Sequence, residues 1–186
     1  FTDIVPNPTV TSVDALSAVV RSTDCDAVIA VGGGSTMDSA KVAGAIASNG
    51  GSAADYFGFD KFSEPPDRPL ICLPTTAGTG AEASRVAVVV AEGGKQAIYS
   101  DHIQPQGAIV DPQLTAGMPA GLTATTGLDA LGHALECTAS KKCDALGDAV
   151  AREALAAGMP AFLRAITHGH DMEARYQMCR CSLLAG

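Results

Sequence analysis

An aspartate and a histidine stand four residues apart in the segment TTGLDALGHALE, residues 125–136. This spacing on a helix places Asp129 and His133 on one face, one turn apart. A carboxylate and an imidazole are suitable ligands for Fe²⁺ or Zn²⁺, so the pair is a candidate half of a metal site. An ordinary structural or surface pair is the alternative. A buried face is favoured by the leucines around the pair: Leu128, Leu131 and Leu135.

A second candidate site is the glycine-rich segment VIAVGGGSTMDSAK, residues 28–41. It predicts a strand, a glycine turn and a helix opened by Ser35, with Asp38 completing an S-x-x-D capping box. Glycines permit close backbone approach, and a helix N-terminus offers unpaired N–H groups to a pyrophosphate. The segment is neither a G-x-G-x-x-G fingerprint nor a P-loop, so a tight structural turn stays open as the alternative.

The third candidate is a threonine-rich loop, LPTTAGTGAEAS, residues 73–84. Hydroxyl groups beside flexible backbone at the carboxyl end of a strand suit ligand binding at a sheet crevice. The alternative is a polar loop that caps a helix, with Thr79 as the N-cap and Glu82 three residues later.

Elements that could position these sites alternate along the first part of the chain. Buried strands are predicted at 25–31 and 69–74, and a further short strand at 107–112. Helices are predicted at 9–24 and 35–51, and a hairpin within 85–100 that turns at 92–94. From residue 117 onward only helical periodicity remains. This order predicts an α/β domain over residues 1–116, followed by a helical domain over residues 117–186.

Composition excludes several classes of protein. The net charge of -8 leaves no basic patch for nucleic acid. No apolar run approaches the roughly 20 residues of a membrane span. The cysteines show no paired framework; Cys25 and Cys72 fall in predicted strands, and Cys179 and Cys181 in a helix that points their thiols apart. We therefore expect reduced thiols and a cytoplasmic protein.

Five ordered motifs together resemble the iron-containing (group III) alcohol dehydrogenase family. They are PNPT at 6–9, GGGSTMDSAK at 32–41, PTTAGTGAEAS at 74–84, IVDPQLTAGMP at 109–119 and TATTGLDALGHALE at 123–136. The resemblance implies a Rossmann-like nucleotide-binding domain followed by the start of an all-helical metal-binding domain, in the dehydroquinate synthase-like fold. It implies hydride transfer between an alcohol and its aldehyde or ketone.

The resemblance also assigns roles to residues, none of them catalytic. The pyrophosphate would be held by Gly33, Gly34 and Ser35, with Asp38 nearby. Thr75, Thr76 and Thr79 would line the nicotinamide side. Lys95 would approach the cofactor ribose, and Asn7 would lie near the adenine. Asp129 and His133 would be the first two metal ligands.

The implied cofactors are NAD or NADP and a divalent metal, with Fe²⁺ preferred to Zn²⁺. The implied partners are a small alcohol or aldehyde and a second copy of the chain in a homodimer. Relatives complete the metal site with two histidines after SLLAG, so the sequence resembles a central fragment of a longer enzyme. His168 and His170 lie in a polar turn and are expected at the surface. Two alternatives stay open: a catalytically incompetent nucleotide-binding fragment, and a dehydrogenase for a hydroxy acid or phosphonate-type aldehyde.

Overall fold

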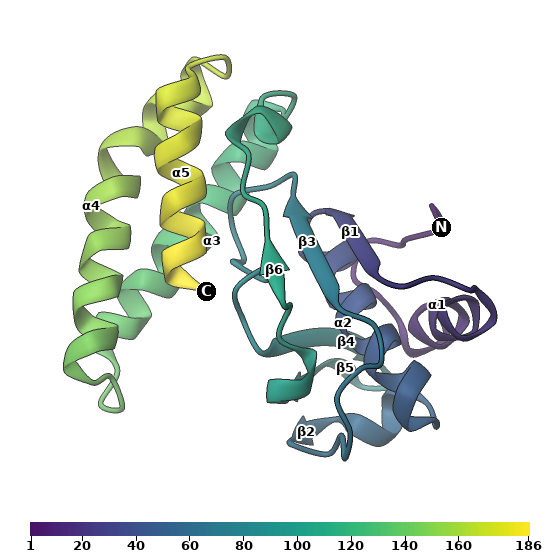
Figure 1. Ribbon diagram of the computed structural model, residues 1–186. Helices are drawn as coiled ribbons and strands as arrows, with labels where there is room; N and C mark the ends of the chain where they lie inside the picture. The colour runs from purple at the N-terminus through teal and green to yellow at the C-terminus, as the bar shows by residue number, and fades with distance from the viewer. The chain divides into compact units, whose positions relative to one another are not determined.

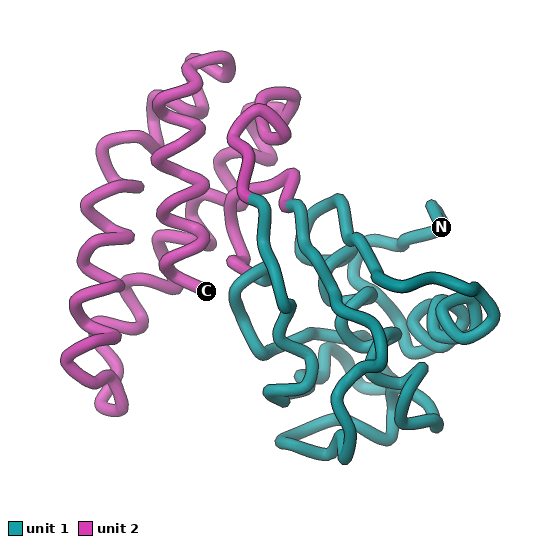
Figure 2. Tube along the Cα trace, viewed as in Figure 1, with its two compact units in different colours: residues 1–73, 81–109 teal, residues 74–80, 110–186 magenta.

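The computed structural model describes all residues, 1–186, and they form two compact units. The first, here called the α/β unit, contains residues 1–73 and 81–109, and the second, the helical unit, contains residues 74–80 and 110–186 (Figure 2). The predicted succession of an α/β part and a helical part is confirmed. The units differ from the predicted division at 116/117, because the α/β unit ends at residue 109 and the short segment 74–80 belongs to the helical unit.

One sheet of the α/β unit has the strand order β1-β3-β6 (Figure 1). These strands are β1 Val28–Gly32, β3 Leu70–Pro74 and β6 Gly107–Ala108, and β3 runs parallel to β6. Helix α2, Gly34–Asn49, packs against β1. A buried cluster joins them: Ala30, Met37, Ala40, Leu70, Cys72 and Ala81.

Strand β1 corrects the expectation of a fully buried strand at 25–31. It begins at Val28, so Cys25 lies outside it. Ala30 is buried, but Ile29 is 63% and Val31 54% exposed. Successive side chains of a strand point to opposite faces, so only the residues on the α2 side of β1 are covered.

The other sheet has the order β2-β5-β4, from β2 Gly58–Phe59, β5 Gly94–Tyr99 and β4 Val86–Ala91. The predicted hairpin is confirmed, because β4 and β5 pair antiparallel and turn through Gly93 and Gly94, whose φ angles of 94° and 123° suit glycine. Helix α1, Val10–Ser22, begins with a capping box between Thr9 and Ser12. The core of this layer is aliphatic and includes Val13, Val42, Ile46, Val89 and Ile98.

The helical unit consists mainly of α3 Ala120–Ala139, α4 Ala145–Thr167 and α5 Met172–Ala185, which pack pairwise. Asp144 and Asp171 cap α4 and α5 at their N-termini. Small residues fill the contacts between these helices, chiefly Ala130, Ala134, Ala154, Ala161, Ala165, Ala174 and Cys181. Small side chains let the helix backbones approach closely.

Three short 3₁₀ helices complete the chain: η1 Ala53–Tyr56, η2 Asp101–Ile103 and η3 Pro112–Thr115. None of the helices combines the length and hydropathy that crossing a bilayer requires.

Candidate functional site

The glycine loop connects β1 directly to α2. Gly33 is the N-cap residue, and no side chain caps the helix. The predicted capping box is wrong, because Ser35 lies inside the helix and the Asp38 carboxylate instead accepts a hydrogen bond from Val88 N–H at 3.0 Å. At Gly32 a Cβ atom would lie 2.3 Å from Thr36 Oγ1, so only glycine fits there. The first amides of α2 therefore have neither an intrahelical partner nor a side-chain cap.

The PNPT turn lies against this loop. Asn7 has a left-handed backbone with φ of 55°, and its N–H donates to Ser35 Oγ at 3.1 Å. The next residue, Pro8, accepts a hydrogen bond from Val90 N–H at 2.7 Å, and Val90 pairs with Lys95 across the hairpin. The PNPT turn and the glycine loop thus meet at the N-terminal end of α2, and Lys95 lies on the strand paired with the one that the PNPT turn contacts.

A buried ionic group lies farther along α2. Lys41 is 1% exposed, and its ammonium donates to Ser84 O at 2.9 Å, Ser84 Oγ at 3.1 Å and Val86 O at 3.0 Å. Burial lowers the pKa of Lys41, and the nearby carboxylates of Asp38 and Glu82 counteract this effect. Burial also raises the pKa of Asp38 from 3.8 to about 6 and raises that of Glu82.

No sequence motif assigned a role to Lys41, although it ends GGGSTMDSAK. The available signal was its position four residues after Met37, on the apolar face of α2. Its three hydrogen bonds fasten α2, which starts at the glycine loop, to Ser84 and Val86 within the α/β unit. Lys41 is therefore a positioning residue for α2 and for the start of β4.

The threonine loop is held by the helical unit. A Cβ atom at Gly78 would lie 2.8 Å from Thr126 Cβ on α3, and Gly80, with φ of 62°, lies against Ser182 O. Thr75 and Thr76 are half-buried and Thr79 is exposed. The helix-capping alternative for Thr79 is wrong, because residues 81–83 form a turn and β4 follows without a helix. The loop thus packs on the helix that carries the metal candidates, one turn before Asp129.

Asp129 and His133 lie together on α3, as the spacing predicted. His133 Nε2 is 3.7 Å from Asp129 Oδ1, and the two side chains are 40% and 45% exposed. The expected buried leucine face is wrong, since Leu128 is 58% and Leu135 53% exposed. The buried stripe of α3 consists of small residues instead: Thr123, Gly127, Ala130 and Ala134. Both ligand candidates therefore remain accessible on one helical face.

The other histidines of the helical unit do not extend this pair. His168 and His170 are exposed, as predicted, and His168 Nδ1 lies 2.9 Å from Thr167 Oγ1. Nowhere in residues 1–186 do three or more His, Cys, Asp or Glu side chains form a group suited to a metal ion. The structure thus brings together two candidate ligands, Asp129 and His133.

A glycine loop at a strand-helix junction and an accessible Asp–His pair on a helical unit are thus the candidate nucleotide and metal sites of an α/β protein with a helical part. The comparisons specify the family. Residues 1–112 match the family described as iron-containing alcohol dehydrogenase, and residues 123–186 match the C-terminal part of the Fe-containing alcohol dehydrogenase family. The chain belongs to the iron-containing alcohol dehydrogenase family.

Curated relatives extend over the whole chain. It is 39% identical to alcohol dehydrogenase 4 of Schizosaccharomyces pombe, covering 100% of this chain and 44% of the relative. It is also 39% identical to the NAD-dependent methanol dehydrogenase of Bacillus methanolicus, covering 100% of this chain and 49% of that protein. The chain thus spans about half the length of the curated relatives it matches.

Solved structures agree. A sulfoacetaldehyde reductase from Bifidobacterium kashiwanohense, in complex with NAD⁺, is 41% identical with a TM-score of 0.91, and the match covers 100% of this chain and 50% of that one. A 1,3-propanediol oxidoreductase is 38% identical with a TM-score of 0.95, covering 100% and 49% of the two chains. The fold and the family predicted from the motifs are therefore confirmed.

Proposed function

We propose that this chain carries the NAD-binding part and the first two metal ligands of an alcohol dehydrogenase. The enzyme would transfer a hydride between a small alcohol and its aldehyde or ketone. One observation carries the proposal: the start of α2 is uncapped, lined by glycine and joined to the PNPT turn by the hydrogen bond from Asn7 to Ser35. Because the relatives are about twice as long, the activity of a whole protein is part of the proposal.

The residues at the glycine loop fit a pyrophosphate. The amides of Gly34 and Ser35 lie in the first turn of α2, where the helix dipole favours negative charge. Gly33 allows close approach because it has no side chain. Lys95, exposed on β5, would reach the ribose, and Asn7 would lie near the adenine. Asp38 would lie near the pyrophosphate, with its carboxylate accepting the hydrogen bond from Val88 N–H.

The threonine loop and α3 would contact the nicotinamide end of the cofactor and the metal ion. The hydroxyl groups of Thr75, Thr76 and Thr79 would line the nicotinamide. Asp129 and His133 fit a divalent cation, because a carboxylate and an imidazole are accessible on one face, and we propose Fe²⁺ before Zn²⁺. When bound, the cation supplies Lewis acidity toward the alcohol oxygen and the nicotinamide supplies the hydride acceptor. Two protein ligands hold a cation weakly, since affinity follows ligand number and a preformed site.

The proposed substrate is a small alcohol or its aldehyde or ketone. Relatives include a sulfoacetaldehyde reductase and a 4-hydroxybutyrate dehydrogenase, whose names indicate anionic substrates, so a dehydrogenase for a hydroxy acid or a phosphonate-type aldehyde is the alternative. The proposal of a homodimer in the cytoplasm stays a prediction, to be checked by light scattering and cell fractionation.

The cofactor proposal is tested by two nearly isosteric variants, Gly33→Asp and Gly33→Asn. Gly33 has an extended backbone that any residue adopts, and both replacements are good N-caps, so neither should weaken α2. The added carboxylate repels a pyrophosphate, and we expect NADH affinity to fall about 10- to 100-fold relative to Gly33→Asn. NADH fluorescence titrations measure this difference. Affinities of both variants equal to that of the wild type would show that the pyrophosphate does not bind here.

The metal proposal is tested by Asp129→Asn and His133→Gln, with Glu136→Gln as the control on the same helix. Calorimetric titration with Fe²⁺ under argon, or with Co²⁺ followed by absorbance, should give a weak site that both variants lose. The control should retain it. Unchanged binding in both ligand variants would place the cation elsewhere.

A further inference from the structure

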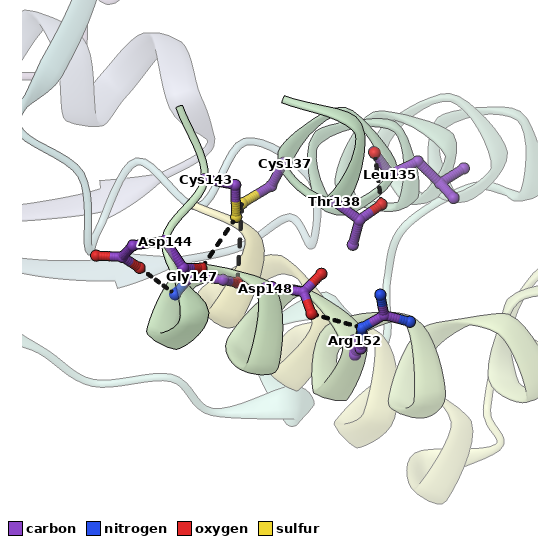
Figure 3. A network of polar contacts seen from close by, with 8 residues as sticks. All are labelled: Leu135, Cys137, Thr138, Cys143, Asp144, Gly147, Asp148 and Arg152. Carbon is purple, nitrogen blue, oxygen red and sulfur yellow. Dashed lines mark hydrogen bonds and ion pairs between the residues drawn. The ribbon is translucent and has the colours of Figure 1, made fainter. Parts of the chain in front are cut away.

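Two cysteine thiols meet where α3 passes into α4. Cys137 lies in the last turn of α3, and Cys143, six positions later in sequence, precedes the N-cap of α4. Their sulfur atoms are 3.5 Å apart (Figure 3). Both side chains are half-buried, so a small reagent can reach them from solvent. This pair lies within the helical unit, and Cys137 is one turn of α3 beyond His133.

The surroundings leave the two sulfurs free to approach each other. Their further contacts are weak: Cys137 Sγ is 3.8 Å from Gly147 O, and Cys143 Sγ is 3.5 Å from Asp144 O. Gly147 provides the room, since a Cβ atom there would lie 3.2 Å from Cys143 Sγ. A disulfide bond is about 2.05 Å long, so the sulfurs must approach by about 1.5 Å. Side-chain rotation and the short turn between the helices can supply that movement.

Other cysteines of the chain are in less reactive surroundings. Cys72 and Cys181 are completely buried, and burial raises the pKa of each thiol to about 11. The pKa of Cys143 is also raised, first by its hydrogen bond with Cys137 and further by the carboxylates of Asp148 and Asp144. Cys143 therefore stays mainly protonated near neutral pH, and we expect oxidation over minutes to hours rather than seconds.

We propose that Cys137 and Cys143 form a reversible disulfide that fastens the end of α3 to the start of α4. The oxidant is a low-molecular-weight disulfide such as oxidised glutathione. The thiolate of one cysteine attacks it, forms a mixed disulfide and releases one glutathione thiolate. The thiolate of the other cysteine then attacks the protein sulfur of that mixed disulfide and releases the second. Two electrons pass to glutathione, and the two thiol protons pass through solvent to the released thiolates.

The first test uses the whole chain and maps the linkage. The protein is incubated with oxidised glutathione, free thiols are alkylated, and a digest is analysed without reduction. We expect a peptide cross-linked at Cys137 and Cys143, a loss of two alkylatable thiols and reversal by dithiothreitol. Persistent alkylation at both positions, a stable glutathione adduct, or linkage to another cysteine would overturn the proposal.

Matched variants give an independent test. Cys137→Ser and Cys143→Ser should each abolish the cross-link, whereas Cys25→Ser, at a half-buried cysteine outside the pair, should retain it. Closing this short turn should raise the apparent Tm of the oxidised wild type by about 5 °C. Neither pair variant should show an oxidant-dependent shift. A shift of similar size in both pair variants would mean that oxidation acts at other thiols.

Discussion

The two units of this chain hold their candidate sites in different ways. In the α/β unit, hydrogen bonds from buried or turn residues connect separate elements, as Lys41 does for α2 and β4. In the helical unit, α3, α4 and α5 approach through alanine, glycine and cysteine, and the Asp129–His133 pair lies on an accessible face. The candidate nucleotide site therefore depends on hydrogen bonds between separate elements, and the candidate metal site depends on the close packing of the helices behind it.

The difference is instructive because each kind of support fails differently. A buried polar group that loses its partner keeps its full desolvation cost. A small-residue contact fails when volume is added, because the packed interior has no space to receive it. The helical unit also contains one buried cation supported by hydrogen bonds. Arg175 donates to Thr123 Oγ1 at 2.9 Å and to Gly169 O at 2.9 Å.

The largest expected effect is that of Lys41→Met. The substitution leaves Ser84 O and Val86 O without their donor and leaves Asp38 and Glu82 without a compensating cation. We expect a loss of about 3–5 kcal/mol in the free energy of unfolding, measured by urea denaturation. The exposed Lys95→Met is the control and should change stability by less than about 0.5 kcal/mol. A similarly small loss for Lys41→Met would contradict the claim that buried hydrogen bonds stabilise the α/β unit.

Asp38→Asn should change the pH dependence of stability. In the folded protein the pKa of Asp38 is raised from 3.8 to about 6, so the folded state binds the proton more tightly than the unfolded state. The resulting stabilisation is complete below pH 3.8 and is lost as pH rises to about 6. The amide variant keeps an acceptor for Val88 N–H and lacks this loss, so above that range it should be more stable by up to about 3 kcal/mol.

The measurement for Asp38→Asn is the unfolding free energy over a pH series that brackets the raised pKa. Asp24→Asn, at an exposed carboxylate, serves as the charge-matched control. Parallel pH profiles for wild type and Asp38→Asn would show that this carboxyl group does not carry the effect.

Gly158→Ala tests the packing half of the comparison. A Cβ atom at Gly158 would lie 2.5 Å from Cys181 Sγ, where α4 meets α5. We expect a loss of about 1–3 kcal/mol. Gly132→Ala on α3 is the matched change, because its Cβ atom would meet nothing within 4 Å, and it should add about 0.5–1 kcal/mol through helix propensity. Thermal unfolding of both variants measures the contrast, and equal shifts would contradict it.

The smallest effect on stability is expected at the metal candidates. Asp129→Asn and His133→Gln remove an exposed i,i+4 pair, and each should change the free energy of unfolding by less than about 0.5 kcal/mol. A cation that binds here should raise the Tm of the wild type but not of these variants. A large loss of stability without any cation would instead assign the pair a structural role.

Much of the fold followed from sequence because the signals were local. The apolar runs, glycine turns and helical periodicity located β3, the β4–β5 hairpin, α1, α2 and the helical character of the chain after residue 117. Failures came where a neighbour decides the outcome. The burial of β1 depends on which of its faces α2 covers. The predicted capping box at Ser35 did not form because the Asp38 carboxylate accepts a hydrogen bond from Val88 N–H instead. Likewise, Leu128 and Leu135 of α3 are exposed, because the buried stripe of that helix consists of small residues.

The sequence by itself determined the family, the order of the elements and the position of Asp129 relative to His133, since these depend on motif identity and helical spacing. Only the tertiary structure decided that Asn7 meets Ser35, that the threonine loop packs with the helices and that Lys41 is buried against Ser84 and Val86. It also brought the sulfurs of Cys137 and Cys143 together. Such contacts join residues through the path of the backbone and the space left by neighbouring side chains, which spacing along the chain does not specify.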